Sequence, residues 1–187
     1  MKSRIILLLC FIFTLGFTAQ AQDYTYSAAQ RGEAWAQFDM GLRCYNSKNY
    51  SKAVQWFTRA ANQGYADAQH YMGVCYATGQ GVQKNYRWAT DWYAKAARQG
   101  HSDAQYNLAL RFFLGQGVQK NYYRAVEWWE AAARQGHAAS QYSLGLRYWN
   151  GEGVVEDRST AIDWMRMAAN QGYKAAKDFL RKHGYYY

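Results

Sequence analysis

One motif recurs four times along the chain at a constant interval. Each copy begins with alanine, continues through two large side chains and an alanine pair, and ends in Gln-Gly. The copies begin 36 residues apart, at Ala53, Ala89, Ala125 and Ala161. A period of roughly 20 to 50 residues is the signature of a repeat array, in which each unit packs on its neighbours. The chain is therefore expected to be an array of four similar units.

Each unit is predicted to contain two helices joined by a turn. In the second unit, Ala68, Met72 and Tyr76 follow the i, i+4, i+8 spacing that places side chains on one helix face. A Gly-x-Gly-Val turn comes next, and its first glycine can adopt the left-handed conformation that ends a helix. These turns lie at 79–82, 115–118 and 151–154. A side-chain oxygen can then cap the second helix, at Asn85, Asn121 and Asp157.

The two ends of the array differ from its middle. In the first unit the loop at 46–49 is four residues shorter than the others and lacks the Gly-x-Gly-Val turn. After the fourth unit, Ala176 and Leu180 begin another helix of the first type, in which Arg181 occupies the position of Gly145. A charge there fits a helix that no further unit covers, so this segment is expected to be a solvent-facing cap.

The first 21 residues have the pattern of a secretory signal peptide. Lys2 and Arg4 precede an apolar run from Ile5 to Phe17, and Ala19-Gln20-Ala21 supplies the small residues of a cleavage site. The run has 13 residues, fewer than the roughly 20 that a membrane-spanning helix needs. Cleavage after Ala21 is therefore favoured over a stable membrane anchor, and the protein is expected to be periplasmic or secreted. The segment 22–33 is predicted to be a leader, loose over 22–30.

The composition favours a folded, exported protein over other classes. Half of the residues are hydrophobic and only 19% are charged, which is unlike a disordered chain. Without the signal peptide the chain has 20 basic and 13 acidic residues, a net charge of +7. This balance could favour anionic envelope polymers, but the charges are scattered, as on ordinary helix surfaces. No block of lysine and arginine suggests nucleic-acid binding, so no nucleic-acid partner is expected.

The units resemble Sel-1-like repeats, which are relatives of the tetratricopeptide repeat. The segment Ala104-Gln105-Tyr106-Asn107-Leu108 and the glycine turn at 115–118 carry the resemblance, although Ala109 replaces the usual glycine. The resemblance covers about 34–181, and the short-looped first unit is more similar to a tetratricopeptide repeat. It implies an all-α fold, a right-handed α-α superhelix (solenoid) of four helix-turn-helix repeats plus a C-terminal capping helix. It also implies a scaffold that binds other proteins.

The expected organisation follows from the resemblance and the repeat register. It comprises a signal peptide at 1–21, a leader at 22–33, a tetratricopeptide-like repeat at 34–66, Sel-1-like repeats at 67–102, 103–138 and 139–174, and a capping helix with a tail at 175–187. The sequence assigns no role to the last three tyrosines, 185–187.

First-type helices line the inner wall of arrays of this kind, so their residues outside the packing face are candidates for binding. These positions are strongly aromatic and apolar, which usually marks a binding surface, and aromatics are favoured anchors. The candidate groove comprises Trp35, Phe38, Leu42, Tyr45, His70, Val74, Tyr106, Leu110, Phe113, Tyr142, Leu146 and Trp149, with Arg43, Arg111 and Arg147 beside it. The arginines could clamp a carboxylate. The alternative is that these aromatics pack between repeats.

No set of residues points to catalysis, a cofactor or a metal. His101 and His137 stand at matching positions where two other units have tyrosine, so they are interpreted as packing residues. His70 has Asp67 one turn before it but no third ligand for zinc. No serine has an evident base, and the glycine turns lack the Gly-Lys-Ser/Thr ending of a phosphate loop.

The leading interpretation is an exported non-catalytic scaffold that binds a peptide or partner protein of the cell envelope in an aromatic-lined concave groove. Some cysteine-rich exported members of the family bind or slowly hydrolyse β-lactams, which makes a weak β-lactam-binding or β-lactamase-like hydrolase one alternative. Their cysteines pair within each repeat, whereas this chain has Ala-Ala and Ala-Gln there. An envelope glycan binder is the other alternative.

Cys44 and Cys75 are the only cysteines after the predicted cleavage site. They fall on first-type helices of adjacent units, and export favours oxidation. A disulfide between them requires a Cα separation below about 7 Å. A disulfide and two free buried thiols both remain open at this point.

Overall fold

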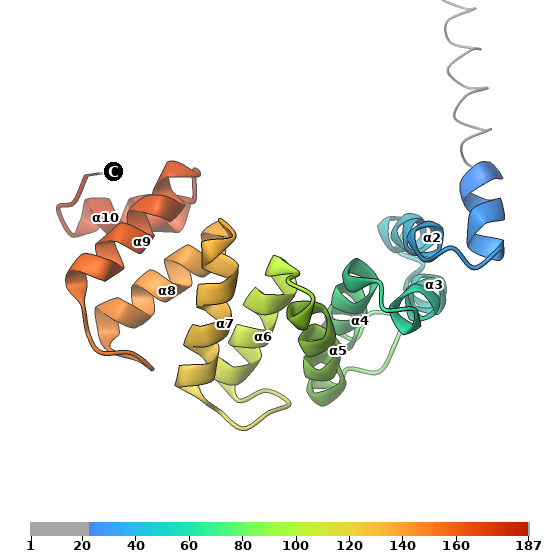
Figure 1. Ribbon diagram of the computed structural model, residues 1–187, viewed down its shortest axis with the longest axis horizontal. Helices are drawn as coiled ribbons and strands as arrows, with labels where there is room; N and C mark the ends of the chain where they lie inside the picture. Colours follow the sequence, from blue (N-terminus) through green and yellow to red (C-terminus); the bar gives the residue numbers. More distant parts are fainter. Residues whose placement is uncertain (1–22, 187) are drawn as a thin grey trace, which may run out of the picture.

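The computed structural model describes residues 23–186, and all regular secondary structure within this range is α-helical. The helices form a curved array whose two ends rise on the same side of the view in Figure 1. The first helices of the units are α2 (Ala34–Asn46), α4 (Ala66–Thr78), α6 (Ser102–Leu114) and α8 (Ala138–Asn150). The second helices are α3 (Tyr50–Asn62), α5 (Tyr86–Arg98), α7 (Tyr122–Arg134) and α9 (Arg158–Asn170). The array ends with α10 (Lys174–Lys182).

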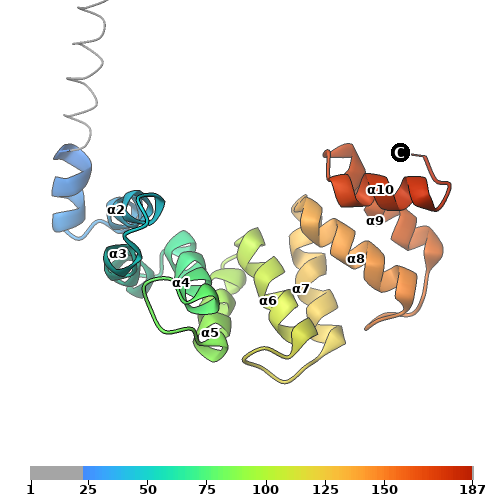
Figure 2. The same cartoon turned by 180° about the vertical axis from the view of Figure 1, so that it is seen from behind.

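Each helix makes its extensive contacts with the helices before and after it in the chain. The same succession is visible from the other side in Figure 2. This confirms the predicted fold, a right-handed solenoid of four helix-turn-helix units with a capping helix. A chain of nearest-neighbour contacts is what a repeat array requires.

The helix ends lie where the sequence predicts them. A side-chain oxygen of each capping residue accepts a hydrogen bond from the backbone N–H three residues further on, at Asn85, Asn121 and Asp157. The first glycine of each turn is left-handed, with φ of 80° at Gly79, 68° at Gly115 and 67° at Gly151. The short loop of the first unit instead turns through Lys48, at φ 62°.

Glycine, which has no side chain, allows the two helices of a unit to approach closely. A Cβ atom added to Gly73 would lie 2.5 Å from the Tyr93 ring, and one added to Gly145 would lie 2.8 Å from Met165 Cγ. Both distances are shorter than the roughly 3.5–4.0 Å of a carbon–carbon contact. On α10 the same position holds Arg181, whose side chain is 71% exposed. The predicted solvent-facing cap is therefore confirmed.

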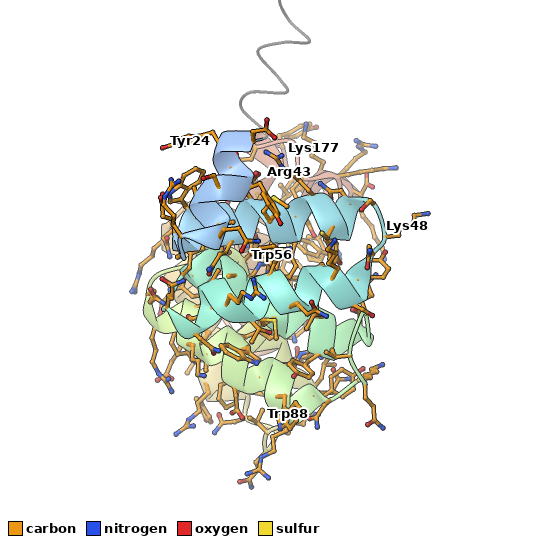
Figure 3. The ribbon with its side chains drawn as sticks, turned by 90° about the vertical axis from the view of Figure 1, so that its right-hand side faces the viewer. Tyr24, Arg43, Lys48, Trp56, Trp88 and Lys177 are labelled. Carbon is orange, nitrogen blue, oxygen red and sulfur yellow. The ribbon has the colours of Figure 1, made fainter. Side chains whose placement is uncertain are left out.

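Residues 23–30, predicted to be a loose leader, instead form a helix, so that prediction is wrong for this segment. Ala28 and Ala29 are buried, and Gly32 has a φ of 95°, close to the 89° of Gly64 after α3. Figure 3 shows Arg43 beside this helix, where its Nη2 donates to Thr25 Oγ1 at 3.4 Å. The segment therefore has the features of a second helix, and no first helix precedes it within residues 23–186.

The predicted signal peptide and its cleavage point lie outside the described residues. Within residues 23–186, every helix is too short or too polar to cross a bilayer. At the other end, the tail folds back on the last unit, because Tyr185 packs against Trp149 and Arg166 Nε donates to the Tyr186 carbonyl at 3.0 Å. The tail as far as Tyr186 thus has a structural role that the sequence does not reveal.

Candidate functional site

A buried glutamine joins each unit to the one before it. Gln105 Nε2 donates to the Ala97 carbonyl at 3.2 Å, and its Oε1 accepts a hydrogen bond from Gln135 Nε2 at 2.7 Å. The same pair of bonds forms around Gln37, Gln69 and Gln141. A buried amide needs such partners, so the network fixes how adjacent units stack. In the sequence, the sign of this role is that the glutamine recurs in every repeat, which does not by itself reveal the hydrogen bonds.

Most of the predicted groove residues pack against neighbouring helices, and several of them lie in the seams between units. Trp35 and Arg43 are exposed, Trp35 at 43%, and Arg147 is buried. The half-buried members are Phe38, Leu42, Tyr45, His70, Val74, Tyr106, Leu110, Phe113, Tyr142, Leu146 and Trp149. Phe38 and Tyr45, for example, lie 5.6 and 5.5 Å from the ring of Tyr71, which belongs to the next unit. This is the arrangement of the alternative interpretation, and the groove itself stays a prediction.

Arg147 lies inside a seam rather than beside an open groove. Only 8% of the residue is exposed, and its guanidinium lies 4.3 Å from the centre of the Phe113 ring. Its Nη1 is 3.1 Å from Glu152 Oε2, and burial lowers the pKa of the guanidinium. The predicted carboxylate clamp is therefore wrong for Arg147, whose partners are internal. The other two arginines also bind within the chain, Arg43 to Asp39 at 2.8 Å and Arg111 to Gln116 at 2.6 Å.

The two repeated histidines cap helices and connect units. Nδ1 of His137 accepts a hydrogen bond from the Ser140 backbone N–H at 3.2 Å, so the ring proton of the neutral form lies on Nε2. That Nε2 is 3.1 Å from Asp103 on α6, so the residue that caps α8 is tied to the first helix of the third unit. His101 repeats the arrangement with Ala104 and Asp67. The structural interpretation of these residues is therefore confirmed.

His70 is enclosed next to His101. The two rings stack at 4.6 Å, and His70 Nε2 lies 3.1 Å from Asn107 Nδ2. Burial, followed by the charge of His101, lowers the pKa of His70 to about 4, so it is neutral at physiological pH. Among the described residues, no three His, Cys, Asp or Glu side chains converge as metal ligands do.

Both cysteines of the described chain are free thiols. Cys75 is completely buried in the core between the first two units, and burial raises the pKa of its thiol to about 11. A thiol with such a pKa is a poor nucleophile at neutral pH. Of the two possibilities left open by the sequence, the structure has the free thiols.

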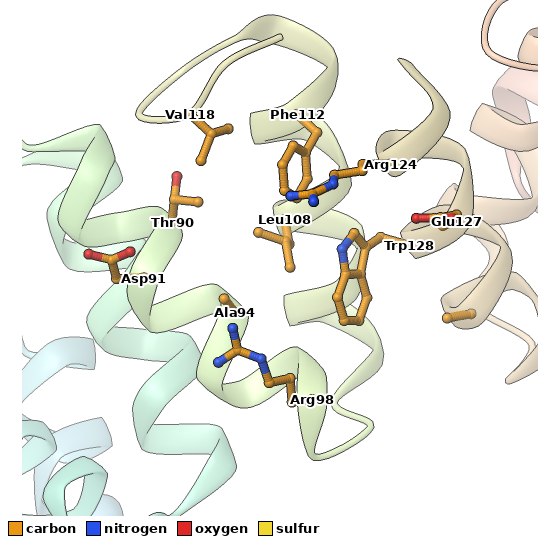
Figure 4. A pocket seen from close by; sticks show the side chains of 11 residues that line it. Thr90, Asp91, Ala94, Arg98, Leu108, Phe112, Val118, Arg124, Glu127 and Trp128 are labelled. Carbon is orange, nitrogen blue, oxygen red and sulfur yellow. The ribbon is translucent and has the colours of Figure 1, made fainter. Parts of the chain in front are cut away.

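A pocket of about 540 Å³ opens between second helices, on a surface that the sequence analysis did not consider (Figure 4). Its walls are α5 and α7, and Leu108 and Phe112 of α6 contribute the apolar surface between them. Trp128 lines it from α7, and Val118 lines it from the glycine turn. A volume of several hundred Å³ with a mostly apolar lining is typical of ligand pockets.

Four charged side chains surround this pocket. Asp91 and Arg98 come from α5, and Arg124 and Glu127 come from α7. Within residues 23–186, none of the four forms an ion pair. Arg124 lies 5.6 Å from the centre of the Phe112 ring. The pocket therefore combines apolar surface with charges of both signs that have no internal counterion.

The stacked helix pairs, their glutamine junctions and the surfaces that they expose define an α-solenoid scaffold. The Sel1 repeat family model matches residues 36–65, 66–101, 102–137 and 138–173. The chain belongs to the Sel1 repeat family. Repeats of this family generally act as scaffolds for protein–protein interaction, and the family is mainly non-catalytic.

Solved structures agree with this assignment. A protective antigen of uropathogenic Escherichia coli with an SLR fold is 35% identical, with a TM-score of 0.82 over 88% of this chain and 37% of that one. A Sel1 repeat protein from Oxalobacter formigenes is 34% identical, with a TM-score of 0.77 over 83% of this chain and 64% of that one. The chain thus spans less than two thirds of either protein.

A more distant structure shares the fold alone. The Helicobacter pylori cysteine rich protein B is 21% identical, with a TM-score of 0.56 over 70% of this chain and 96% of that one. Among curated proteins, none matches the sequence significantly.

Proposed function

We infer that this protein is an exported, non-catalytic scaffold that binds a peptide or a partner protein of the cell envelope. The family assignment supports the scaffold, and the signal-peptide pattern at 1–21 supports export. Partner binding in the envelope follows from these two together.

The contrast between the junctions and the outer surface carries the proposal. Residues that join units are nearly the same in every repeat, such as the buried glutamines and the alanine pairs. Outer positions are not: one position near the start of the second helices holds Lys52, Trp88, Arg124 and Thr160. Trp88 is 53% exposed and lies at the lower edge of the view in Figure 3. A regular frame with a different side chain at each outer position is suited to recognising one particular, non-repeating partner.

Two measurements test the two parts of the proposal. Export predicts that the secreted or periplasmic form begins at Gln22, which mass spectrometry of the mature protein detects. A protein that retains residues 1–21 and stays in the cytoplasm would contradict it.

Scaffolding predicts that residues 22–187, immobilised and exposed to an envelope extract, retain a discrete protein. The matched control is the same chain with Trp35→Ala and Trp88→Ala, which removes two exposed indoles and should lower the yield without changing the helical circular dichroism signal. If a solenoid of unrelated surface retains the same proteins, the scaffold proposal fails. A nitrocefin assay on the same preparation is expected to show no turnover above buffer.

A further inference from the structure

The tryptophan in the pocket lacks a cation that two of its three counterparts have. A tryptophan recurs at the same position of each second helix, as Trp56, Trp92, Trp128 and Trp164. In the first two units a basic side chain three residues later lies over the indole, Arg59 at 4.6 Å and Lys95 at 3.9 Å from the ring centres. In the third unit that position is Ala131. The Trp128 ring therefore lines open space where the first two units place a cation.

Two alanines account for the opening. Ala131 on α7 and Ala94 on α5 both line the pocket. The position of Ala94 holds Thr58, Glu130 and Arg166 in the other units, and the position of Ala131 holds Arg59, Lys95 and Met167. The junction of α5 with α7 is thus the place where both facing positions are small, and the pocket lies there (Figure 4).

The carboxylates on the two walls of the pocket suit a positive ligand. In Figure 4, Asp91 and Glu127 lie on opposite walls, on α5 and α7, with Leu108 between them. The ring face of a tryptophan attracts cations, and a nearby carboxylate adds to that attraction. Because neither carboxylate forms an ion pair with any residue that the structure describes, a ligand need not displace one.

The arginines of the pocket would attract a negative group on the same ligand. Arg124 already packs on Phe112, but Arg98, at the lower end of the pocket in Figure 4, has no counterion among the described residues. Asp91 and Arg98 are seven residues apart on α5, which corresponds to about 10 Å along the helix axis. An extended peptide covers that distance in about three residues.

We propose that this pocket binds a partner's peptide segment through a lysine or arginine side chain. The cation lies over Trp128, between Asp91 and Glu127, in the place that Lys95 occupies over Trp92. An acidic residue two or three positions away on the same segment pairs with Arg98. The inference rests on the proposed scaffold function and adds to it a site and a partner chemistry.

An NMR titration with a defined peptide tests the proposal. The probe is acetyl-Gly-Lys-Gly-Glu-Gly-amide, and the readout is the indole N–H resonance of Trp128, assigned through Trp128→Phe. The expected result is a saturable shift of that resonance. Replacing the lysine of the probe by the uncharged norleucine should raise the dissociation constant at least tenfold. If the norleucine peptide binds as tightly, or the lysine peptide causes no saturable shift, the proposal is wrong.

The matched protein variant is Ala131→Lys, which should restore over Trp128 the internal cation seen over Trp92. It should fold like the wild type and raise the dissociation constant at least tenfold. Asp91→Asn and Glu127→Gln should each weaken binding severalfold, which tests the carboxylates without filling the pocket. Unchanged affinity in all three variants would overturn the proposal.

Two further results separate the alternatives. n-Butylamine should bind at least tenfold more weakly than the peptide, and equal affinity would overturn the peptide proposal in favour of a small-amine site. A partner retained equally by wild type and Ala131→Lys in the envelope extract would leave the scaffold function intact and refute the pocket as its site.

Discussion

Replacing Gly73 with alanine tests whether the glycine on the first helix of three of the four units sets the spacing of the two helices in a unit. The new Cβ would lie 2.5 and 2.6 Å from two carbons of the Tyr93 ring. Carbon atoms in contact are about 3.5–4.0 Å apart, so the ring would have to move by about 1 Å. Tyr93 is buried in the core with Ala89 and Leu108, which leaves little room for that shift.

Two opposing effects determine the expected magnitude for Gly73→Ala. Overpacking a well-packed core costs about 1–3 kcal/mol. Alanine in place of glycine stabilises a helix by about 1 kcal/mol through its higher helix propensity. The free energy of unfolding should therefore fall by about 0–2 kcal/mol, measured by urea unfolding followed by circular dichroism. A midpoint at higher urea concentration than the wild type would refute the reasoning, because it would show that helix propensity outweighs packing.

The third unit supplies the matched control, since it has alanine where the others have glycine. The free energy of unfolding of Ala109→Gly should fall by about 1 kcal/mol because glycine has a lower helix propensity, and by about 0.8 kcal/mol more because a buried methyl group is lost.

A double variant tests the contact itself. In a Tyr93→Leu background the ring is absent, so Gly73→Ala should become neutral or stabilising, and a coupling energy near zero would contradict the proposed contact.

Three further predictions concern the pH response, the turns and the junctions. The pKa of His70 is about 4, below the 6.5 of an unfolded histidine, so the unfolded chain binds the extra proton between these values and stability falls as pH falls through that window. Between pH 7 and pH 5 the unfolding free energy of the wild type should fall by about 2 kcal/mol more than that of His70→Gln, and equal pH dependence would contradict the shift. Gly117→Ala places a Cβ against the backbone of the preceding unit. The control Gly136→Ala has a similar positive φ, but its Cβ meets no atom within 4 Å. Urea unfolding should show that Gly117→Ala is at least about 2 kcal/mol more destabilising than Gly136→Ala. Gln105→Ala leaves the buried partners of its amide unsatisfied and should cost about 1–3 kcal/mol, against less than about 0.5 kcal/mol for the exposed Gln119→Ala, and similar midpoints for the two would refute the structural role of the junction.

The fold could be predicted because several independent features of the repeat all indicate the same pair of helices. The 36-residue register, the apolar face of Ala68 and Met72, and the caps at Asn85 and Gly79 all recur together. The helix at 23–30 could not be predicted in the same way. It has the alanine pair and the glycine of a second helix, but Arg31 stands where the repeats have glutamine, and no first helix precedes it within the described residues.

The candidate site was less predictable, for a physical reason. Helical spacing shows which side chains share a face, but not whether the next unit covers that face. Phe113 and Arg147 share the predicted wall, and both lie in the seam between two units. The pocket depends on the absence of long side chains at Ala94 and Ala131, and alanine at a single position is too common to attract notice. Only comparison of all four units shows that both changes meet at one junction.

The glutamine junctions make the units interchangeable in principle. If residues 102–137 were deleted, Gln141 would meet the Ala97 carbonyl in place of the Ala133 carbonyl, with no amide left over. The frame could therefore lose a whole unit and still close its hydrogen bonds. The same deletion would remove Trp128, so loss of a unit changes length and recognition together, whereas exchange of a single alanine changes recognition alone.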